Sequence, residues 1–257
     1  MICEDFFHVI TEKAKEYKYS SLNHLEFDEC KNAEILYDRD DLILMQDNNK
    51  TSAILYFATN DFEALIKLIA DISGAQRLHF VPRDFVAQLN EIGFVEWGEY
   101  VDFFNTDLSK TITQFDCVDE IDYLSVDDCE EASIVSKSCK LQSRGFEGES
   151  TEWFAQWLNE NNVIIQRRDS VIAGYCCVSI YNEGTTLWIR EIAVDPKYQG
   201  TGLGKKLMEQ AIKYGIENGA VKGFLAADIL NENAISLYNK YDFYAKDTKG
   251  ELQMIKQ

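Results

Sequence analysis

A glycine-dense loop at residues 199–204 is the part of the sequence best suited to chemistry. It follows an apolar, β-branched segment that ends at Asp195-Pro196, and it precedes a segment with helical periodicity. Glycines let the backbone approach a ligand closely, and the first N–H groups of a helix have no partner inside that helix. Together with the positive end of the helix dipole, these N–H groups form an anion site, so we expect the loop to hold phosphate.

The spacing of the loop decides which kind of phosphate it suits. A Walker A loop requires Gly-x-x-x-x-Gly-Lys-Ser/Thr, but the residue five before Gly204 is Gln199, and Lys205 is followed by another lysine. A dinucleotide loop requires Gly-x-Gly-x-x-Gly, and Lys205 fills its third position. Both nucleotide readings are therefore disfavoured. The pattern that remains is Gln-x-x-Gly-x-Gly, at Gln199, Gly202 and Gly204.

A second motif lies downstream, at residues 230–243. Its sequence, Leu-Asn-Glu-Asn-Ala-Ile-Ser-Leu-Tyr-Asn-Lys-Tyr-Asp-Phe, resembles the Asn-x-x-Ala-x-x-Leu-Tyr-x-x-x-Gly-Phe motif of the GNAT superfamily of N-acetyltransferases. The loop at 199–204 resembles the pyrophosphate-binding motif of the same family, Gln/Arg-x-x-Gly-x-Gly/Ala. The second motif departs from the family at Asp242, where glycine is usual. Aspartate tolerates the left-handed conformation better than most residues, so we expect the turn to survive.

The elements expected around both motifs follow the order of the GNAT fold, β-α-α-β-β-β-α-β-α-β. Strands are predicted at 121–126, 163–167, 171–180, 186–194 and 223–229, with one or two closing strands in 243–255. Helices are predicted at 129–140, from 150 onward, at 202–218 and at 231–240. The fold class is therefore α/β (α+β), with a mixed, mostly antiparallel sheet flanked by helices. The resemblance covers residues 119–257.

The resemblance implies acetyl transfer from acetyl-CoA to an amine. Backbone N–H groups of the loop would hold the pyrophosphate, and the preceding strand would pair with the pantetheine arm and polarise the thioester carbonyl. Asn231 matches a family asparagine that contacts the pantetheine arm. Tyr238 matches a tyrosine that acts as general acid, and its alternative role is that of a core aromatic residue. The expected cofactor-binding residues are Ile192, Ala193, Val194, Gln199, Gly200, Thr201, Gly202, Leu203, Gly204 and Asn231.

The motifs leave the general base open. The two positions that carry a glutamate in some family members hold Trp188 and Ala226 here. Glu191 is the candidate base, but strand alternation places it on the opposite face from Trp188 unless a bulge intervenes. A structural ion pair is its competing role. Asp228 and deprotonation through ordered water are the other sources of base catalysis, whereas His79 is expected to be a core or surface residue.

The N-terminal half resembles a second, degenerate GNAT domain, the alternative being an unrelated α/β domain. Helices are predicted at 5–17, 61–72 and 83–92, and strands at 33–37, 41–46, 51–58, 77–81 and 95–104. Thr59-Asn60-Asp61-Phe62-Glu63 stands where the glycine loop would be, and acidic residues at a helix start would repel pyrophosphate. We expect one acetyl-CoA site per chain, and a structural or cleft-forming role for this half.

The expected division is a degenerate GNAT-like domain at 1–110, a linker at 111–118 and a catalytic domain at 119–257. The linker is placed in a polar stretch that is short of apolar residues.

Composition limits the classes of ligand and partner that we expect this protein to bind. The formal net charge is −19 in 257 residues, which argues against nucleic acid and is compatible with a cationic amine substrate or with plain solubility. The sequence has no apolar run of 18 residues and no signal-peptide pattern, so a cytoplasmic protein without a membrane partner is expected. The seven cysteines lack zinc-ligand spacing, so no metal is expected, and Cys176 and Cys177 are predicted to be buried, reduced thiols.

Two functions follow from these observations. Tyr238 and Asn231 favour an N-acetyltransferase in which a primary amine attacks acetyl-CoA directly in a ternary complex. The missing glutamates favour a catalytically weak acyl-CoA-binding protein that senses or scaffolds. The identity of the amine is not encoded in either motif.

Overall fold

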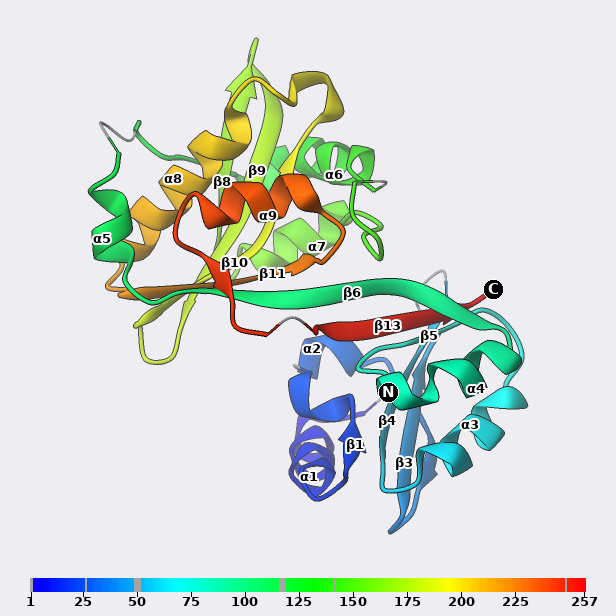
Figure 1. Ribbon diagram of the computed structural model, residues 1–257. Helices are drawn as coiled ribbons and strands as arrows, with labels where there is room; N and C mark the ends of the chain where they lie inside the picture. The colour runs from blue at the N-terminus through cyan, green and yellow to red at the C-terminus, as the bar shows by residue number, and fades with distance from the viewer. Residues whose placement is uncertain (1, 26, 49–51, 116–118, 141, 248) are drawn as a thin grey trace. The chain divides into compact units, whose positions relative to one another are not determined.

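The chain folds into two compact units. The computed structural model describes residues 2–25, 27–48, 52–115, 119–140, 142–247 and 249–257. Unit 1 comprises Met1–Glu99 and Glu251–Gln257, and unit 2 comprises Tyr100–Gly250. Parallel pairing is seen between β4 and β5 and between β10 and β11, and the other pairings described are antiparallel. The expected mixed, mostly antiparallel sheet flanked by helices is therefore confirmed (Figure 1).

Unit 2 has the strand order β6-β11-β10-β9-β8-β7, and β12 also pairs with β6. Its strands are β6 (Phe94–Asn105, shared with unit 1), β7 (Asp122–Tyr123), β8 (Asn162–Arg168), β9 (Val171–Tyr181), β10 (Thr186–Val194), β11 (Lys222–Asp228) and β12 (Tyr244–Ala245). Its helices are α5 (Leu108–Ile112), α6 (Cys129–Ser138), α7 (Thr151–Trp157), α8 (Leu203–Glu217) and α9 (Glu232–Asn239). Short 3₁₀ turns lie at Val126–Asp128 and Pro196–Tyr198.

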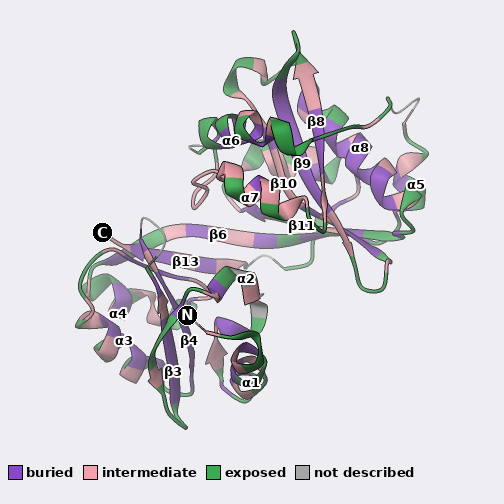
Figure 2. Ribbon diagram, turned by 180° about the vertical axis from the view of Figure 1, so that it is seen from behind, coloured by how far each residue is buried: buried purple, intermediate pink, exposed green. Residues whose placement is uncertain are grey.

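Buried side chains cover both faces of the unit 2 sheet. The adjacent residues Cys176 and Cys177 of β9 show the division, because successive side chains of a strand point to opposite faces. Cys176 packs in the cluster that includes α8 and α9, and Cys177 in the cluster that includes α6 and α7. Both are fully buried and unpaired, as predicted. Figure 2 shows the same concentration of buried residues along the central strands.

Unit 1 has the strand order β2-β3-β4-β5-β13-β6, and β1 pairs with β4. Its strands are β1 (Tyr19–Ser20), β2 (Glu34–Asp38), β3 (Leu42–Asp47), β4 (Ala53–Thr59), β5 (Gln76–Leu78) and β13 (Glu251–Lys256). Its helices are α1 (Glu4–Ala14), α2 (Phe27–Cys30), α3 (Phe62–Ala70) and α4 (Val86–Glu91), with 3₁₀ turns at Leu22–His24 and Arg83–Phe85. An amphipathic face buries α3 on the sheet through Phe62, Leu65, Ile66 and Ile69.

The two units repeat one strand plan. Residues 53–55 of β4 pair in parallel with 76–78 of β5, and residues 186–188 of β10 pair in parallel with 222–224 of β11. The second strand of each pair then meets an antiparallel strand from a distant part of the chain. In unit 1 that strand is β13, from the C-terminal end, and in unit 2 it is β6, from the end of the N-terminal half. The units therefore exchange their closing strands.

This exchange moves the boundaries away from those expected at 110 and 119. Because β6 continues in register with β11 through residue 105, residues 100–110 belong to unit 2. Because β13 pairs with β5, residues 251–257 belong to unit 1 rather than to a domain at 119–257. Sequence periodicity carries no information about such pairing, since each strand looks the same whichever unit receives it.

The expected linker at 111–118 begins inside α5. Leu108 and Thr111 are fully buried, and Ile112 packs against the unit 2 core one helical turn after Leu108. These two apolar residues supply the anchors that the polar appearance of the segment concealed. Residues 116–118 lie outside the described residues.

The turn at Asp242 forms as expected. Asp242 has a φ of +60°, which lies in the left-handed region. Its carboxylate accepts hydrogen bonds from Thr111 Oγ1 at 3.2 Å and from Gln114 Nε2 at 2.7 Å. These bonds help to hold a conformation that glycine would adopt without strain.

Candidate active site

The candidate site lies where the parallel strands β10 and β11 separate. Their described ladder ends at Trp188 and Phe224. Beyond that point β10 stays paired with β9 as far as Val194, while β11 stays paired with β6 as far as Asp228. The edges that face each other, residues 189–194 of β10 and 225–228 of β11, therefore have no strand-to-strand hydrogen bonds in the described ladder. We call this region the splayed end, and its backbone groups are available to a ligand.

Register shows which of the expected strand residues face the splayed end. Asp195 N donates to Ala173 O at 3.0 Å, so the backbone groups of Asp195 point toward β9. In an antiparallel ladder the residues that bond to the neighbouring strand alternate with residues that do not, so Ala193 also bonds to β9. The backbone groups of Ile192 and Val194 therefore point away from β9. The Val194 carbonyl already accepts from Gln199 Nε2 at 3.0 Å and from Cys139 Sγ at 3.3 Å. Ile192 thus offers both of its backbone groups, and Val194 offers its N–H.

The glycine loop connects the end of β10 to the start of α8. Gly200 and Gly202 have φ angles of +73° and +87°, and a Cβ at either position would meet no atom within 4 Å. Gly202 is the N-cap of α8, and no side chain caps this helix end. The first helical bond runs from Lys206 N to Gly202 O at 3.1 Å, which leaves the N–H groups of Leu203 and Gly204 without an intrahelical partner.

Side chains of the loop support its shape rather than extend toward a ligand. Gln199 bonds back to the Val194 carbonyl, and Thr201 Oγ1 donates to Tyr198 O at 2.6 Å. The Leu203 side chain is buried, at 1% exposure. The loop therefore presents backbone N–H groups at a positive helix end, which is the arrangement that suits pyrophosphate.

The N-terminus of the corresponding helix of unit 1, α3, is capped by a carboxylate. Asp61 is the N-cap of α3, and its Oδ1 accepts from Ala64 N at 3.0 Å. A negative side chain thus occupies the place that an anion would take, and Glu63 adds a second charge in the first turn. This contrast with the uncapped α8 supports the prediction that unit 1 holds no pyrophosphate.

Tyr238 lies on α9 inside the unit 2 core, with 8% of its surface exposed. Its ring meets that of Phe103 edge-on at a centroid distance of 6.0 Å. Within the described chain its hydroxyl has no hydrogen-bond partner. Burial, with smaller contributions from Cys176 and Glu191, raises the pKa of this hydroxyl above the usual value, so the proton is retained.

A β-bulge decides the position of Glu191. The β9–β10 register shifts between Ile189, opposite Val178, and Glu191, opposite Cys177, so that Arg190 is the extra residue. The bulge places Glu191 on the α6–α7 face together with Trp188, whose ring centroid lies 5.8 Å from that of Trp157. The condition stated from the sequence, that a bulge must intervene, is met.

Glu191 sits in a polar network on that face. Its carboxylate accepts from the Tyr175 hydroxyl and from Ser136 Oγ at 3.4 Å. Its side chain is 10% exposed, and Arg190 Nη1 lies 3.4 Å from Oε2. Burial and then the nearby Glu149 charge raise the pKa of Glu191 well above its usual value. A carboxyl group with a raised pKa is suited to proton transfer near neutral pH.

Arg190, at the centre of this network, is a residue that the motifs do not single out. Arg190 lies 3.2 Å from Glu149 Oε1, and its guanidinium lies 4.3 Å from the ring centre of Trp153. Arg190 lies two residues after Trp188, so regular strand alternation would place it on this face and Glu191 on the opposite one. The bulge brings Arg190 and Glu191 to one side, which residue spacing alone does not reveal.

Asp228, the second candidate base, is fixed in an ion pair. It lies at the end of β11 with a 2% exposed side chain, and Arg144 Nη2 is 2.7 Å from its Oδ1. It also accepts from Arg144 Nε and N, both at 3.0 Å, and from Leu230 N at 3.2 Å. Burial would raise the pKa of Asp228, but these donors outweigh it and hold the pKa below its usual range. A carboxylate with four donors is poorly placed to accept another proton.

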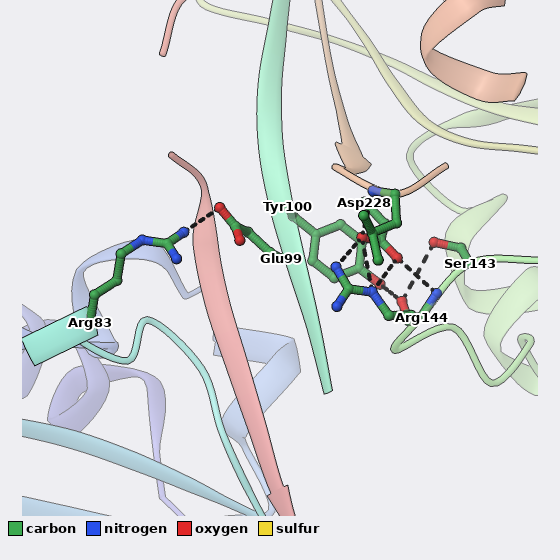
Figure 3. A network of polar contacts seen from close by, with 7 residues as sticks. Arg83, Glu99, Tyr100, Ser143, Arg144 and Asp228 are labelled. Atoms are coloured by element: carbon green, nitrogen blue, oxygen red, sulfur yellow. Dashed lines mark hydrogen bonds and ion pairs between the residues drawn. The ribbon is translucent and has the colours of Figure 1, made fainter. Parts of the chain in front are cut away.

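This ion pair ties β11 to the segment between α6 and α7. Tyr100 donates its hydroxyl proton to Arg144 O, so β6 contributes to the same anchor (Figure 3). Ser143 Oγ also lies 3.5 Å from that carbonyl. Asp228 therefore has a structural part in the site.

Replacement of Arg144 tests this anchor. Arg144→Ala is expected to lower the free energy of unfolding by about 2 kcal/mol, because Asp228 is left buried with fewer donors. The effect is present at neutral pH and disappears as the pH falls through the lowered pKa of Asp228, since the carboxylate then becomes neutral. Urea unfolding at several pH values measures it. Arg168→Ala, at an exposed end of β8, is the control and should change stability by less than about 0.5 kcal/mol; equal effects of the two variants would contradict the anchor.

Asn231 has a structural task that the motif comparison did not reveal. It is the N-cap of α9, and its Oδ1 accepts from Ala234 N at 3.2 Å. Its side-chain amide N–H₂ remains a donor, so a pantetheine contact and the capping role are compatible. The segment of the second motif thus begins with its cap and ends at the Asp242 turn.

His79 lies in the other unit of the chain, not in the one that contains the splayed end. His79 belongs to unit 1, where its Nδ1 lies 3.6 Å from Glu251 Oε1, and burial with the Arg77 charge lowers its pKa to about 4. The described residues contain no cluster of His, Cys, Asp or Glu that could hold a metal ion. Nor does that part of the chain form a helix long and apolar enough to cross a membrane.

Comparison with known proteins identifies the family of the region that contains the splayed end and the glycine loop. Residues 127–243 match the profile described as the acetyltransferase (GNAT) family. The match spans α6 to the Asp242 turn and includes the glycine loop, Glu191 and Tyr238. Residues 127–243 therefore belong to the GNAT family of acetyltransferases.

Two curated relatives are similar to part of the chain. An uncharacterized N-acetyltransferase of Methanocaldococcus jannaschii is 28% identical over 114 residues, covering 41% of this chain and 50% of the relative. A spermine/spermidine N(1)-acetyltransferase of Bacillus subtilis is 32% identical over 80 residues, covering 30% of this chain and 53% of the relative. The chain spans about half the length of these curated relatives.

The tandem arrangement has a structural counterpart. A tandem GNAT protein from the clavulanic acid biosynthesis pathway superposes with a TM-score of 0.57 at 12% identity, covering 82% of this chain and 77% of that one. At this identity the likeness concerns the fold alone. It agrees with the repeated strand plan of units 1 and 2.

Proposed function

We propose that this protein is an acetyl-CoA-dependent N-acetyltransferase that acetylates a primary amine by direct attack in a ternary complex. The observation that carries the proposal is the uncapped α8 N-terminus beside the splayed end of β10 and β11. An anion site, free backbone groups and a protonated tyrosine meet in one unit. In unit 1 the corresponding helix end, the N-terminus of α3, is capped by Asp61.

The residues present suit acetyl-CoA. The N–H groups of Gly202, Leu203 and Gly204 would hold its pyrophosphate, supported by the rest of the loop, Gln199 to Thr201. The backbone of Ile192 and Val194 would pair with the pantetheine arm, with Ala193 holding the strand to β9, and the Asn231 amide would donate to the arm. When bound, acetyl-CoA supplies a thioester acetyl group. Strand N–H groups at the splayed end would polarise its carbonyl.

Two side chains would handle protons. Tyr238, which keeps its proton because its pKa is raised, would donate it to the departing thiolate. Glu191, whose raised pKa makes it a stronger base than an exposed carboxylate, would accept a proton from the amine, directly or through water. Asp228 would remain bound to Arg144 throughout.

A cationic amine is the substrate class that the charges favour. The formal net charge of −19 attracts cations at long range. The relative named as a spermine/spermidine acetyltransferase adds support for a polyamine-like amine. Spermidine is therefore the first amine to test, followed by aminoglycosides, lysine and N-terminal peptides.

The proposal is tested with the full chain, acetyl-CoA and this amine panel. Loss of the thioester absorbance and mass spectrometry of the acetylated amine are suitable readouts, because Cys3 is exposed and would react with thiol reagents. Turnover of at least one amine is expected. Binding of acetyl-CoA without turnover of any amine would instead support the acyl-CoA-binding alternative.

The pH dependence tests Glu191. Glu191→Gln keeps the shape and an acceptor oxygen but removes the base, so kcat at neutral pH should fall about 100-fold. Glu149→Gln is the matched comparison, because it removes the like charge that raises the pKa of Glu191. The rising limb of kcat/KM should move to lower pH in this variant. An unchanged profile in both variants would assign deprotonation to water.

Stability gives a second readout for the same group. Folding raises the pKa of Glu191, so the protonated side chain stabilises the folded protein. This contribution to the free energy of unfolding is fully present below the pKa of the unfolded chain, about 4.3, and is lost as the pH rises through the pKa of the folded protein. Glu191→Gln should therefore gain stability over the wild type as the pH rises. The gain is at most about 1.4 kcal/mol for each pH unit in that window.

A further inference from the structure

A second pocket lies in unit 2 at the amino ends of β10 and β11. Its volume is about 640 Å³, within the range of small-molecule sites. It is formed by the end of β6, by α5, by the hairpin between β9 and β10, and by the start of β11 and β12. The lining residues are Phe104, Asn105, Thr106, Asp107, Lys110, Tyr181, Asn182, Thr186, Lys222, Gly223, Asp242, Tyr244 and Lys246.

This pocket is separate from the proposed acetyl-CoA site. Thr186 and Lys222 open the parallel ladder, whereas the splayed end begins only beyond Trp188 and Phe224. The glycine loop follows the opposite end of β10. At about 3.3 Å per residue, Thr186 and Val194 are separated by more than 20 Å along the strand.

Three lysines converge on the pocket although the protein is strongly acidic. Within the described chain, Lys110, Lys222 and Lys246 form no ion pair with a carboxylate. Other lysines do pair with a carboxylate, as Lys206 does with Asp119 at 2.8 Å. Asp107 and Asp242 also line the pocket, so its three lysines leave an excess of one positive charge, which favours a bound anion on this concave surface.

The two carboxylates in the lining are already engaged. Asp107 caps α5, and its Oδ1 accepts from Ser109 Oγ at 2.6 Å and from Lys110 N at 3.2 Å. Asp242 accepts from Thr111, Gln114 and Tyr244. These bonds fix the positions of both carboxylates but do not remove their charges, so a ligand would bind through the lysines, which carry the one excess positive charge of the lining.

Aromatic side chains supply the other half of the lining. Phe104, Tyr181 and Tyr244 are exposed by 37%, 37% and 56%, which is unusual for large rings. Phe104 is held by Phe224 at a centroid distance of 5.3 Å. Exposed rings in a pocket provide surfaces on which a flat ring can stack.

We propose that this pocket binds a phosphorylated ligand with a planar ring, of the mononucleotide class. Lysine is a point charge that suits a phosphate, whereas a carboxylate ligand would be better matched by the fork of an arginine. No arginine lines the pocket. The phosphate would lie among the lysines, and the ring would stack on the exposed aromatics. The Asn182 amide donates to Thr186 Oγ1 at 3.4 Å, and its oxygen and second N–H would read polar edges of the ring.

The test is calorimetric titration of the full chain with uridine monophosphate in the absence of CoA, because the phosphorylated adenosine of CoA belongs to the same ligand class and would compete for the pocket. One uridine monophosphate per chain is expected. Uridine and inorganic phosphate, which each lack one half of the ligand, should bind more weakly. Higher salt should weaken binding of the nucleotide.

Variants distinguish this pocket from general attraction. Lys222→Gln and Lys246→Gln should each weaken the nucleotide about threefold to fivefold, the range of a partly exposed ion pair. Lys213→Gln, on α8 outside the lining, removes the same charge and should leave affinity unchanged. Tyr244→Ala should weaken the nucleotide but not inorganic phosphate. Equal affinity for uridine and its monophosphate, or equal effects of all three lysine variants, would overturn the proposal.

Discussion

Tyr238→Phe is expected to lower kcat about 100-fold or more while leaving the affinity for acetyl-CoA unchanged. The fall is the size expected when a positioned general acid is removed. The ring keeps its packing against Phe103, because phenylalanine fills the same space. The hydroxyl forms no hydrogen bond with any described residue, so its removal leaves no partner unsatisfied, and the unfolding midpoint should change little.

A neighbouring tyrosine provides the control for this variant. Tyr241 is also buried in the unit 2 core, but its hydroxyl donates to Glu209 at 3.0 Å. Tyr241→Phe should therefore affect stability more than turnover. Steady-state kinetics, calorimetric titration of acetyl-CoA and thermal unfolding separate the outcomes. Full activity in Tyr238→Phe would show that the thiolate takes its proton from another source.

Much of the fold could be predicted from hydrophobic periodicity and from the glycines that mark the ends of helices and strands. The strand at 186–194 and the helix that follows Gly202 were predicted within a residue, because both combine an apolar pattern with a clear glycine boundary. The exchange of β6 and β13 was not accessible, since pairing over long sequence separation leaves no mark in either strand. Helix α5 was also missed, because Leu108 and Ile112 are too few to show an apolar face.

The candidate site was likewise predictable in part: some of its residues belong to local motifs, and the roles of others depend on distant parts of the chain. The loop residues and Tyr238 belong to short motifs whose function depends on local order, and the structure gathers them in unit 2. Glu191 depends on the bulge at Arg190, which inserts one residue in a single strand and is silent in the sequence. The fate of Asp228 depends on Arg144, which lies 84 residues away in the chain. Long-range partners thus decide which carboxylate is available as a base.

The glycine loop gives the second prediction of large effect. Gly202→Asp is expected to weaken acetyl-CoA binding about 100-fold or more, because it places at α8 the carboxylate that Asp61 places at α3. The new side chain would cap the helix, occupy its free N–H groups and repel the pyrophosphate. Loss of two hydrogen bonds to a charged group is worth that factor. In the wild type, the titration should reach one acetyl-CoA per chain.

Gly202→Ala separates charge from backbone strain in this experiment. Both variants place a Cβ at a φ of +87°, where the cavity has room but an L-residue is disfavoured by about 1–2 kcal/mol. Aspartate tolerates this conformation better than alanine, so strain alone predicts that the alanine variant is the less stable and the weaker binder. Capping and charge predict the reverse order of affinity, with the aspartate variant far weaker. If alanine impairs binding as much as aspartate, or if two acetyl-CoA molecules bind per chain, the α8 N-terminus is not the single pyrophosphate site.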